Sequence, residues 1–255
     1  MLYVKNLYQS YSQTGKESWK HQVLNGIDIH IAPGEFVAVM GPSGSGKTTL
    51  LNCISCYIPF DKGSILLGDI NLAKQKEDTL AAIRNTKIGF VFQDFNLLDT
   101  LTISENIALA LTINHTAAGL IPGRVKEIAE ILNISDILEK YPYQVSGGQK
   151  QRCACARAII NDPKLLLADE PTGALDSHSS QLLLGTMQRI NEQLGTTILM
   201  VTHDAFSASY ANRILFLQDG EIFTELRKGS ASRKEFFEKI LNVLTLMGGG
   251  QSDVC

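Results

Sequence analysis

The segment that most constrains this chain is a glycine-rich stretch between an apolar run at residues 36–40 and a helical pattern that begins near residue 48. It fits the pattern G-x-x-x-x-G-K-[ST] in full, and its residues are Gly41, Pro42, Ser43, Gly44, Ser45, Gly46, Lys47 and Thr48, followed by Thr49. Glycines let backbone N–H groups wrap an anion, and the positive end of the helix dipole adds to the attraction. The stretch therefore predicts a phosphate-binding loop between a strand and a helix.

Two pairs of side chains extend this prediction to nucleoside triphosphate chemistry. Lys47 supplies a charge for the β- and γ-phosphates, and the Thr48 hydroxyl suits Mg²⁺, which prefers hard oxygen ligands. A second apolar run, at residues 165–168, ends in Asp169 and Glu170. We expect Asp169 to hold Mg²⁺, directly or through water, and Glu170 to polarise the attacking water. These residues predict a nucleoside triphosphatase and nothing narrower.

Apolar runs of strand length alternate with helical periods around these motifs. Continuous apolar runs are typical of strands buried on both faces of a sheet, and they occur at residues 36–40, 64–67, 87–92, 165–168 and 197–201. The first forty residues are expected to form short strands with a polar loop or hairpin tip at 11–20. Residues 95–160 are expected to form a helical subdomain, with a helical period over 124–138. The predicted fold class is α/β: a P-loop core with a mostly parallel sheet, an antiparallel β portion at the N-terminus and this helical subdomain.

The C-terminal third carries its own signals. Asp219-Gly220 between two apolar runs predicts a two-residue hairpin turn, residues 232–247 predict an amphipathic helix, and residues 248–255 predict a frayed tail. With one phosphate loop in the chain, residues 1–255 are expected to form a single nucleotide-binding domain.

The composition excludes several classes of protein. Hydrophobic residues make up 44% and charged residues 19%, so the chain can bury a large core. The formal charge of −3 disfavours a nucleic-acid-binding protein. No apolar run approaches the ~18–20 residues of a membrane span, and the N-terminus lacks a signal-peptide pattern, so a cytosolic chain is expected. Of the five cysteines, four are predicted to be buried core thiols: Cys53, Cys56, Cys153 and Cys155. A redox or zinc pair at Cys53 and Cys56 is the alternative.

A further motif lies 23 residues before Asp169: Val145 followed by Ser146, Gly147, Gly148 and Gln149. With this motif, the chain resembles the ATP-binding subunits of ABC transporters over nearly its whole length. The resemblance implies that Ser146 to Gln149 form the signature loop, which closes on the γ-phosphate of ATP held by a second subunit. Two copies would then form a homodimer around two ATP molecules. Val145 stands where leucine is commoner in the family.

The resemblance also assigns roles to isolated residues. Gln93, after the run at 87–92, matches the glutamine that contacts Mg²⁺ and responds to the membrane partner. Asp176 matches the aspartate that crosses the dimer interface, although it is also a good N-cap for the following helix. His203, after the run at 197–201, matches the histidine that contacts the γ-phosphate.

Tyr11 matches the aromatic residue that stacks on adenine, with Tyr8 and Trp19 as alternatives. Residues 94–106 border the groove that receives a permease helix in the family. Apolar side chains in this segment are the kind of anchors that a helix-in-groove contact uses, although they can equally pack the helical subdomain.

The residues around the motifs indicate which branch of the family the chain resembles. It resembles the lipoprotein-release and macrolide-export branch, whose permeases have few spans and a large extracellular domain. Within that branch, residues 141–149, 169–177, 203–211 and 233–241 resemble the bacitracin-resistance (Bce-type) group of Gram-positive bacteria. This implies an ATPase at the cytoplasmic face of the membrane, a separate permease and a partner histidine kinase. Three alternatives stay open: an export ATPase of the broader branch, a signalling switch for the kinase, and, disfavoured by the single cassette and the charge, an ATPase acting on nucleic acid.

Overall fold

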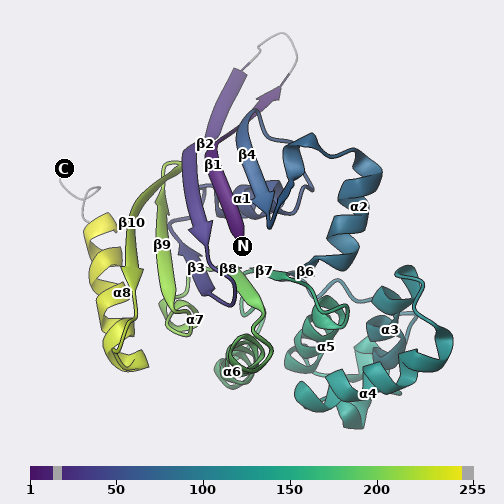
Figure 1. The fold of residues 1–255 in the computed structure, drawn as a ribbon. Helices are drawn as coiled ribbons and strands as arrows, with labels where there is room; N and C mark the ends of the chain where they lie inside the picture. The colour runs from purple at the N-terminus through teal and green to yellow at the C-terminus, as the bar shows by residue number, and fades with distance from the viewer. Residues whose placement is uncertain (14–18, 249–255) are drawn as a thin grey trace.

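The chain folds around two β-sheets (Figure 1). The computed structural model describes residues 1–13 and 19–248. A six-stranded sheet has the order β10-β9-β3-β8-β7-β6, and a four-stranded sheet has the order β2-β1-β4-β5. Figure 1 shows helices α3, α4 and α5 grouped at one end of the molecule and α8 at the other.

The six-stranded sheet is parallel except at one edge. Strands β9, β3, β8, β7 and β6 pair in parallel, and β10 pairs antiparallel with β9. Its members are β3 (Phe36–Met40), β6 (Ile88–Val91), β7 (Leu165–Asp169), β8 (Thr197–Val201), β9 (Arg213–Gln218) and β10 (Glu221–Arg227). The β9–β10 hairpin turns at Asp219 and Gly220, as predicted, and both residues have positive φ as a tight two-residue turn requires.

The four-stranded sheet is antiparallel and begins with a long hairpin. Its members are β1 (Leu2–Gln13), β2 (Trp19–Ile31), β4 (Lys62–Leu67) and β5 (Ile70–Asn71). The prediction of short strands is wrong for β1 and β2, which have 12 and 13 residues. The hairpin predicted at 11–20 is present, but its strands extend further into this range than expected, because pairing continues to Gln13 opposite Trp19. Tyr11 and Ser12, in the outer part of the hairpin, are exposed. A strand pair that extends beyond the core has no buried face, so it needs no alternation of apolar and polar residues.

Eight α-helices lie in the described residues. They are α1 (Lys47–Ile54), α2 (Glu77–Thr86), α3 (Ile103–Ile113), α4 (Ile121–Ile131), α5 (Gly147–Ile159), α6 (Ser177–Leu194), α7 (Ala205–Ala208) and α8 (Arg233–Gly248). The helix predicted over 124–138 begins earlier and ends at Ile131. Asn133 has a φ of 52°, and a left-handed residue at this position ends an α-helix. Of the predicted tail, residues 249–255 lie outside the described residues.

Two apolar cores lie on the two faces of the parallel sheet. Alternate residues of β3 divide between them: Phe36, Ala38 and Met40 face the core with α3 to α6 and α8, whereas Val37 and Val39 face the core with β1, β2, β4 and α1. The strand is therefore buried on both faces, which explains its uninterrupted apolar sequence. Each of its large side chains contributes about 1.5–3 kcal/mol on burial.

The cysteines belong to these cores, as predicted for Cys53, Cys153 and Cys155, which are fully buried. Cys56 is only half-buried. Burial raises the pKa of Cys53 to about 12 and that of Cys56 to about 11, so both thiols are protonated at neutral pH. The fifth, Cys255, lies outside the described residues.

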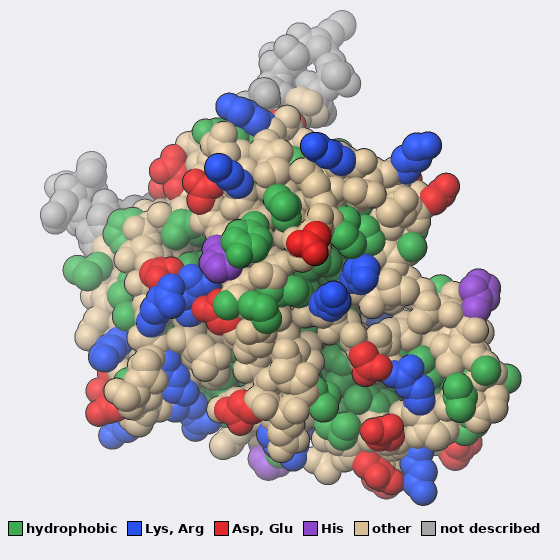
Figure 2. Space-filling model, viewed as in Figure 1, with side chains coloured by type: hydrophobic (Ala, Val, Ile, Leu, Met, Phe, Trp, Pro, Cys, Tyr) green, Lys and Arg blue, Asp and Glu red, His purple; other side chains and the backbone are tan. Residues whose placement is uncertain are grey.

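The charged side chains are mixed on the surface. On the face drawn in Figure 2, Lys and Arg side chains lie among Asp and Glu side chains and uncharged surface, as the near balance of 23 basic and 26 acidic residues leads one to expect.

Candidate functional site

Four neighbouring parallel strands end at the same edge of the sheet, and each is followed by a segment that the sequence singled out. In sheet order these are β3, β8, β7 and β6. They lead into the glycine-rich loop, His203, the Asp169–Glu170 pair and Gln93, respectively. Open α/β sheets bind ligands beyond the carboxyl ends of their strands, so the predicted residues converge because of the strand order.

The glycine-rich loop is held against its surroundings by close backbone approaches. A Cβ atom on Gly41 would lie 2.1 Å from the carbonyl oxygen of Leu217, and Gly46 has a φ of 103° with Val23 and Leu24 close by. Gly46 is also the N-cap of α1 and supplies no side-chain cap. The N–H groups of the first turn of α1 are therefore left for another acceptor.

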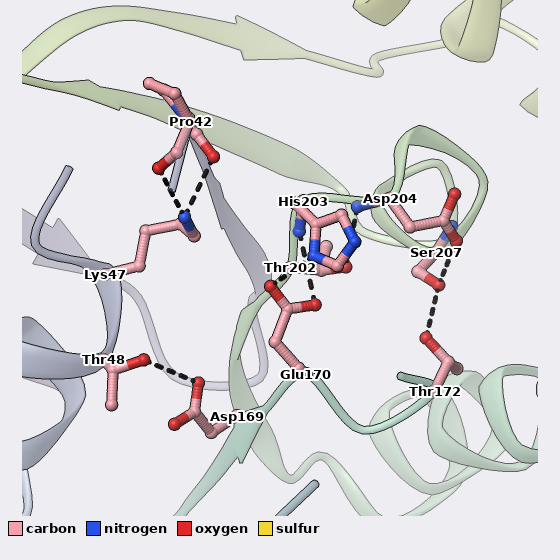
Figure 3. A network of polar contacts seen from close by, with 11 residues as sticks. Pro42, Lys47, Thr48, Asp169, Glu170, Thr172, Thr202, His203, Asp204 and Ser207 are labelled. Carbon is pink, nitrogen blue, oxygen red and sulfur yellow. Dashed lines mark hydrogen bonds and ion pairs between the residues drawn. The ribbon is translucent and has the colours of Figure 1, made fainter. Parts of the chain in front are cut away.

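Lys47 lies at the centre of the loop. Its ammonium group donates hydrogen bonds to the carbonyl oxygens of Gly41, at 2.9 Å, and Pro42, at 2.8 Å (Figure 3). Burial lowers the pKa of this ammonium group from its ordinary value, while the nearby charges of Glu170 and Asp169 oppose the shift. Its charge is thus held beside the anion-binding turn by groups of the loop itself.

Thr48 and Asp169 bring two hard oxygen atoms together at the start of α1. The Thr48 hydroxyl donates to Asp169 Oδ1 at 3.3 Å. Burial raises the pKa of the Asp169 carboxyl group, and the Thr48 hydrogen bond and the Lys47 charge oppose this rise. A hydroxyl and a carboxylate with this spacing fit Mg²⁺, which takes one or two protein oxygens and completes its shell with water and phosphate oxygens.

Glu170 faces His203 from the end of the neighbouring strand. The carboxylate contacts His203 Nδ1 at 2.8 Å and accepts a hydrogen bond from the His203 backbone N–H at 3.3 Å. Glu170 has a φ of 45°, a strained conformation that persists only where the surroundings over-determine it. The His203 side chain is 71% exposed, whereas that of Glu170 is 14% exposed. A shielded carboxylate thus lies beside an imidazole that is open to incoming ligands.

A second polar connection ties the same two loops together. The hydroxyl of Thr172 lies 2.9 Å from that of Ser207, which in turn donates to Asp204 at 2.6 Å (Figure 3). Because Thr172 follows Glu170 and Asp204 follows His203, this buried chain fixes the spacing of the two candidate catalytic residues.

A cavity of about 570 Å³ lies over the loop and reaches the β1–β2 hairpin. It is lined by Tyr11, Val23, Ser43, Gly44, Gly46, Lys47, Thr48, Thr49, Glu170 and His203. Tyr11 is 43% exposed and lies where a base could stack on it. Tyr8 instead has Lys62 over its ring, and the side chain of Trp19 lies outside the described part of the structure.

Ser45 and Gln93 lie near this cavity but do not line it. The Ser45 hydroxyl is buried and has no hydrogen-bond partner among the described residues. Gln93 is exposed beyond the end of β6. Its amide is adjacent to the turn after Glu170, since a Cβ atom on Gly173 would lie 3.1 Å from Gln93 Nε2.

The signature residues form a separate surface and do not line the cavity. Ser146 caps α5 and forms a reciprocal capping box with Gln149. Gly148 packs against Ser179, where a Cβ atom would meet the Ser179 hydroxyl at 2.6 Å. Asp176 caps α6 by accepting from the Ser179 backbone N–H at 2.9 Å and its hydroxyl at 2.8 Å. The starts of α5 and α6 therefore pack together through Ser179, with Ser146 and Asp176 exposed and Gly148 buried.

The ABC transporter family model matches residues 24–173, which span the glycine-rich loop, the signature residues and the Asp169–Glu170 pair. The chain belongs to the ABC transporter family. It is an ATP-binding subunit of that family and therefore an ATPase, as the sequence predicted.

Relatives of this ABC subunit extend over its full length. It is 47% identical to the bacitracin export ATP-binding protein BceA of Halalkalibacterium halodurans over 253 residues, which cover 99% of each chain. It is 48% identical to the ABC transporter ATP-binding protein YxdL of Bacillus subtilis over 254 residues, 100% of this chain and 97% of the relative. The predicted family and branch are thus confirmed.

A solved structure of a similar protein has the same fold and contains bound nucleotide. The dimeric post-hydrolysis state of the ATP-binding cassette MJ0796, bound to ADP and Pi, superposes with a TM-score of 0.81 at 38% identity and covers 89% of this chain and 98% of that one. The predicted fold class is confirmed. ABC subunits of this kind bind nucleotide, dimerise and work with a membrane permease. No helix within residues 1–13 and 19–248 of this subunit has the length and apolar character of a membrane span.

Sequence reasoning missed one residue of the cavity. Val23 lines it from β2 and has no recognisable signal, because an apolar residue on a strand is ordinary. Only the approach of the long hairpin to the glycine-rich loop brings it there.

Proposed function

We propose that this chain is the ATP-hydrolysing subunit of a membrane complex that protects a bacterium against bacitracin-like peptide antibiotics. The observation that carries the proposal is the 47% identity to a bacitracin export ATP-binding protein over 99% of both chains. A match of that extent includes the surfaces outside the nucleotide site, which the partners of the subunit must recognise.

In this proposal the residues at the four strand ends divide the chemistry. Lys47 and the N–H groups of the loop bind the phosphates, while Thr48 and Asp169 hold Mg²⁺ with Gln93 beside them. Glu170 accepts the proton of the attacking water, and His203 contacts the γ-phosphate and orients Glu170 through their 2.8 Å contact. Positioning and electrostatic stabilisation of this kind supply most of the catalysis in phosphoryl transfer.

The signature surface completes the site of a second copy. Ser146, Gly147, Gly148 and Gln149 contact the γ-phosphate of ATP bound to the partner, and Asp176 crosses the interface. Two features support this: these residues lie outside the cavity of their own chain, and the first turn of α5 offers N–H groups and a helix dipole to an anion. The ATP-bound form is accordingly a homodimer with two ATP molecules.

The permease contact is proposed beside Gln93. A cavity of about 590 Å³ lies between the C-terminal end of α1 and α2 and includes Tyr57 and Arg84. The ring of Tyr57 lies 6.4 Å from that of Phe92, the residue before Gln93. A permease helix with apolar anchors would fit this cavity. Seated there, the helix would contact the Gln93 loop. The permease would carry few spans and a large extracellular domain, bind at the cytoplasmic face, and bring a sensor histidine kinase.

The test is a pull-down of the tagged Glu170→Gln variant from native membranes with and without ATP, followed by mass spectrometry. We expect a permease with a large extracellular domain, and a histidine kinase, to be recovered. Recovery of soluble partners or nucleic acid alone would contradict the membrane role and leave the ATPase assignment intact. Deletion of the gene should also raise bacitracin sensitivity, and unchanged sensitivity would remove the antibiotic class from the proposal.

A further inference from the structure

Helix α5 carries a fully buried polar side chain that the proposed chemistry does not use. Gln151 is 0% exposed, and its Nε2 donates two hydrogen bonds to backbone carbonyls of other elements. One acceptor is Phe92, at 3.0 Å, and the other is Pro171, at 2.7 Å. Phe92 precedes Gln93, and Pro171 follows Glu170. A single amide of the signature helix therefore joins the two loops that hold these residues.

The orientation of this amide is fixed by its partners. Both neighbours are carbonyl oxygens, which only accept, so Nε2 must face them. The Oε1 atom is buried and has no hydrogen-bond partner among the described residues. An unpaired buried oxygen costs free energy, and a flipped amide would place that oxygen against two carbonyls. The side chain is thus retained in one arrangement by its two donated bonds.

A second side chain of α5 holds the far end of the Gln93 loop. The guanidinium of Arg157 donates to the carbonyl oxygens of Asn96, at 2.6 Å, and Phe95, at 3.1 Å. Phe95 and Asn96 both have positive φ, 60° and 49°, which costs energy for residues other than glycine. The loop around Gln93 is therefore anchored to α5 on both sides.

The packing of α5 leaves little freedom in these contacts. Its Ala158 carbonyl lies against β6, where a Cβ atom on Gly89 would come within 2.2 Å of that oxygen. The turn after Glu170 is strained, because Glu170 has a φ of 45°. Pro171 is the next residue, and its carbonyl is one of the two that Gln151 holds. A displaced amide would release the Gln93 loop and this strained turn together.

We propose that Gln151 is a positioning residue for ATP hydrolysis: its buried amide sets the places of Gln93 and Glu170 relative to the signature helix without contacting the nucleotide. The inference rests on the proposed role of Glu170 as the residue that activates water.

Gln151→Met tests the proposal, since methionine has a similar length and lacks the donors. We expect kcat, normalised to the ATP bound per subunit, to fall at least about tenfold while KM for ATP changes less than about threefold. In the Glu170→Gln background, Gln151→Met should still form the ATP-dependent dimer. If Gln151→Met does not fold, Gln151→Asn is measured in the same way, because the shorter amide keeps its donors but cannot reach both carbonyls.

Asn191→Leu is the matched control. Asn191 is buried, and its Nδ2 donates to the carbonyls of Gly34, at 2.9 Å, and Thr196, at 2.8 Å. These two residues precede β3 and β8, so they lie at the amino ends of the strands, whereas the candidate site lies at the carboxyl ends. It should lower the melting temperature but leave normalised kcat unchanged.

Three outcomes would overturn the positioning role. They are an unchanged kcat in Gln151→Met, an equal loss in Asn191→Leu, and failure of the double variant to dimerise, which would assign Gln151 to the signature contact instead. An inactive wild-type protein or an active Glu170→Gln variant would refute the proposed chemistry rather than this inference.

Discussion

The two helix N-termini that can face phosphate in this protein are built differently. At α1 the N-cap is Gly46, which has no side chain, so the first turn is uncapped, and Lys47 lies beside it inside a cavity. At α5 the N-cap is Ser146, whose hydroxyl accepts from the backbone N–H of Gln149, while Gln149 accepts from the backbone N–H of Ser146.

This difference explains how one chain can carry two different half-sites: one at α1 for its own nucleotide, and one at α5 for the nucleotide of a second copy. An uncapped turn with a buried lysine binds an anion without help, whereas the capped turn of α5 has its Gln149 N–H already paired with Ser146 and has no lysine in a cavity beside it. The α1 site can therefore hold nucleotide in the monomer. In the proposed function, the α5 surface gains a phosphate contact only when a second copy presents its bound ATP.

The largest expected effect lies in the α1 half. Glu170→Gln removes the carboxylate that we propose as the proton acceptor, so kcat should fall about 10²–10⁴-fold, the usual contribution of a general base. Turnover measured by phosphate release checks the loss, and gel filtration with ATP should show a persistent dimer. Hydrolysis near the wild-type rate would refute the assignment of Glu170.

Lys47→Ala alters the α1 half of the site, which is expected to bind nucleotide without a second copy of the chain. Losing charge-assisted hydrogen bonds to phosphate should weaken ATP binding about 10–100-fold. Isothermal titration of the monomer measures this affinity directly. An unchanged dissociation constant would mean that the loop backbone binds nucleotide without the lysine.

Ser146→Ala tests the difference between the two helix N-termini, because it changes the start of α5 and leaves the start of α1 unchanged. ATP binding to the monomer should change less than about twofold, while ATPase activity falls roughly tenfold through the lost contact across the dimer. The lost cap also costs about 1 kcal/mol of stability.

Ser232→Ala supplies the control for that loss. Ser232 and Glu235 form the same reciprocal contacts at the start of α8, away from both phosphate surfaces. It should lower stability by a similar amount and leave ATPase activity intact. If the two variants lose activity equally, the effect of Ser146 is one of stability alone.

The smallest expected effect concerns stability and pH. Burial raises the pKa of Asp169, so its ionisation destabilises the nucleotide-free fold. The cost is absent below the ordinary pKa of aspartate, develops as pH rises through the raised folded pKa, and is constant above it.

Asp169→Asn should therefore raise the melting temperature at pH 7 without nucleotide, by about 2–4 °C for each kcal/mol relieved, while weakening Mg²⁺–ATP binding. Thermal denaturation at pH 3 and pH 7 measures the difference between the variant and the wild-type protein. The gain should disappear at pH 3, and a gain of equal size at both values would contradict the electrostatic cause.

The sequence by itself determined the local elements and the chemistry of most site residues. The run at 36–40, the glycine-rich loop and the acidic pair after residue 168 each combine a strand, a turn and a functional side chain within a few residues. Such short-range patterns are fixed by backbone sterics and by burial. The Asp219-Gly220 turn is predictable for the same reason.

Only the tertiary structure decided what depends on contacts between distant segments. The contact of Glu170 with His203 follows from strand order, and the position of Val23 follows from the long hairpin. Gln151 is the clearest case: within the polar run Gln149-Lys150-Gln151-Arg152, the sequence indicates neither its burial nor its partners. Those partners lie 59 and 20 residues away along the chain, and only packing of α5 against β6 brings their carbonyls within hydrogen-bond distance of one amide.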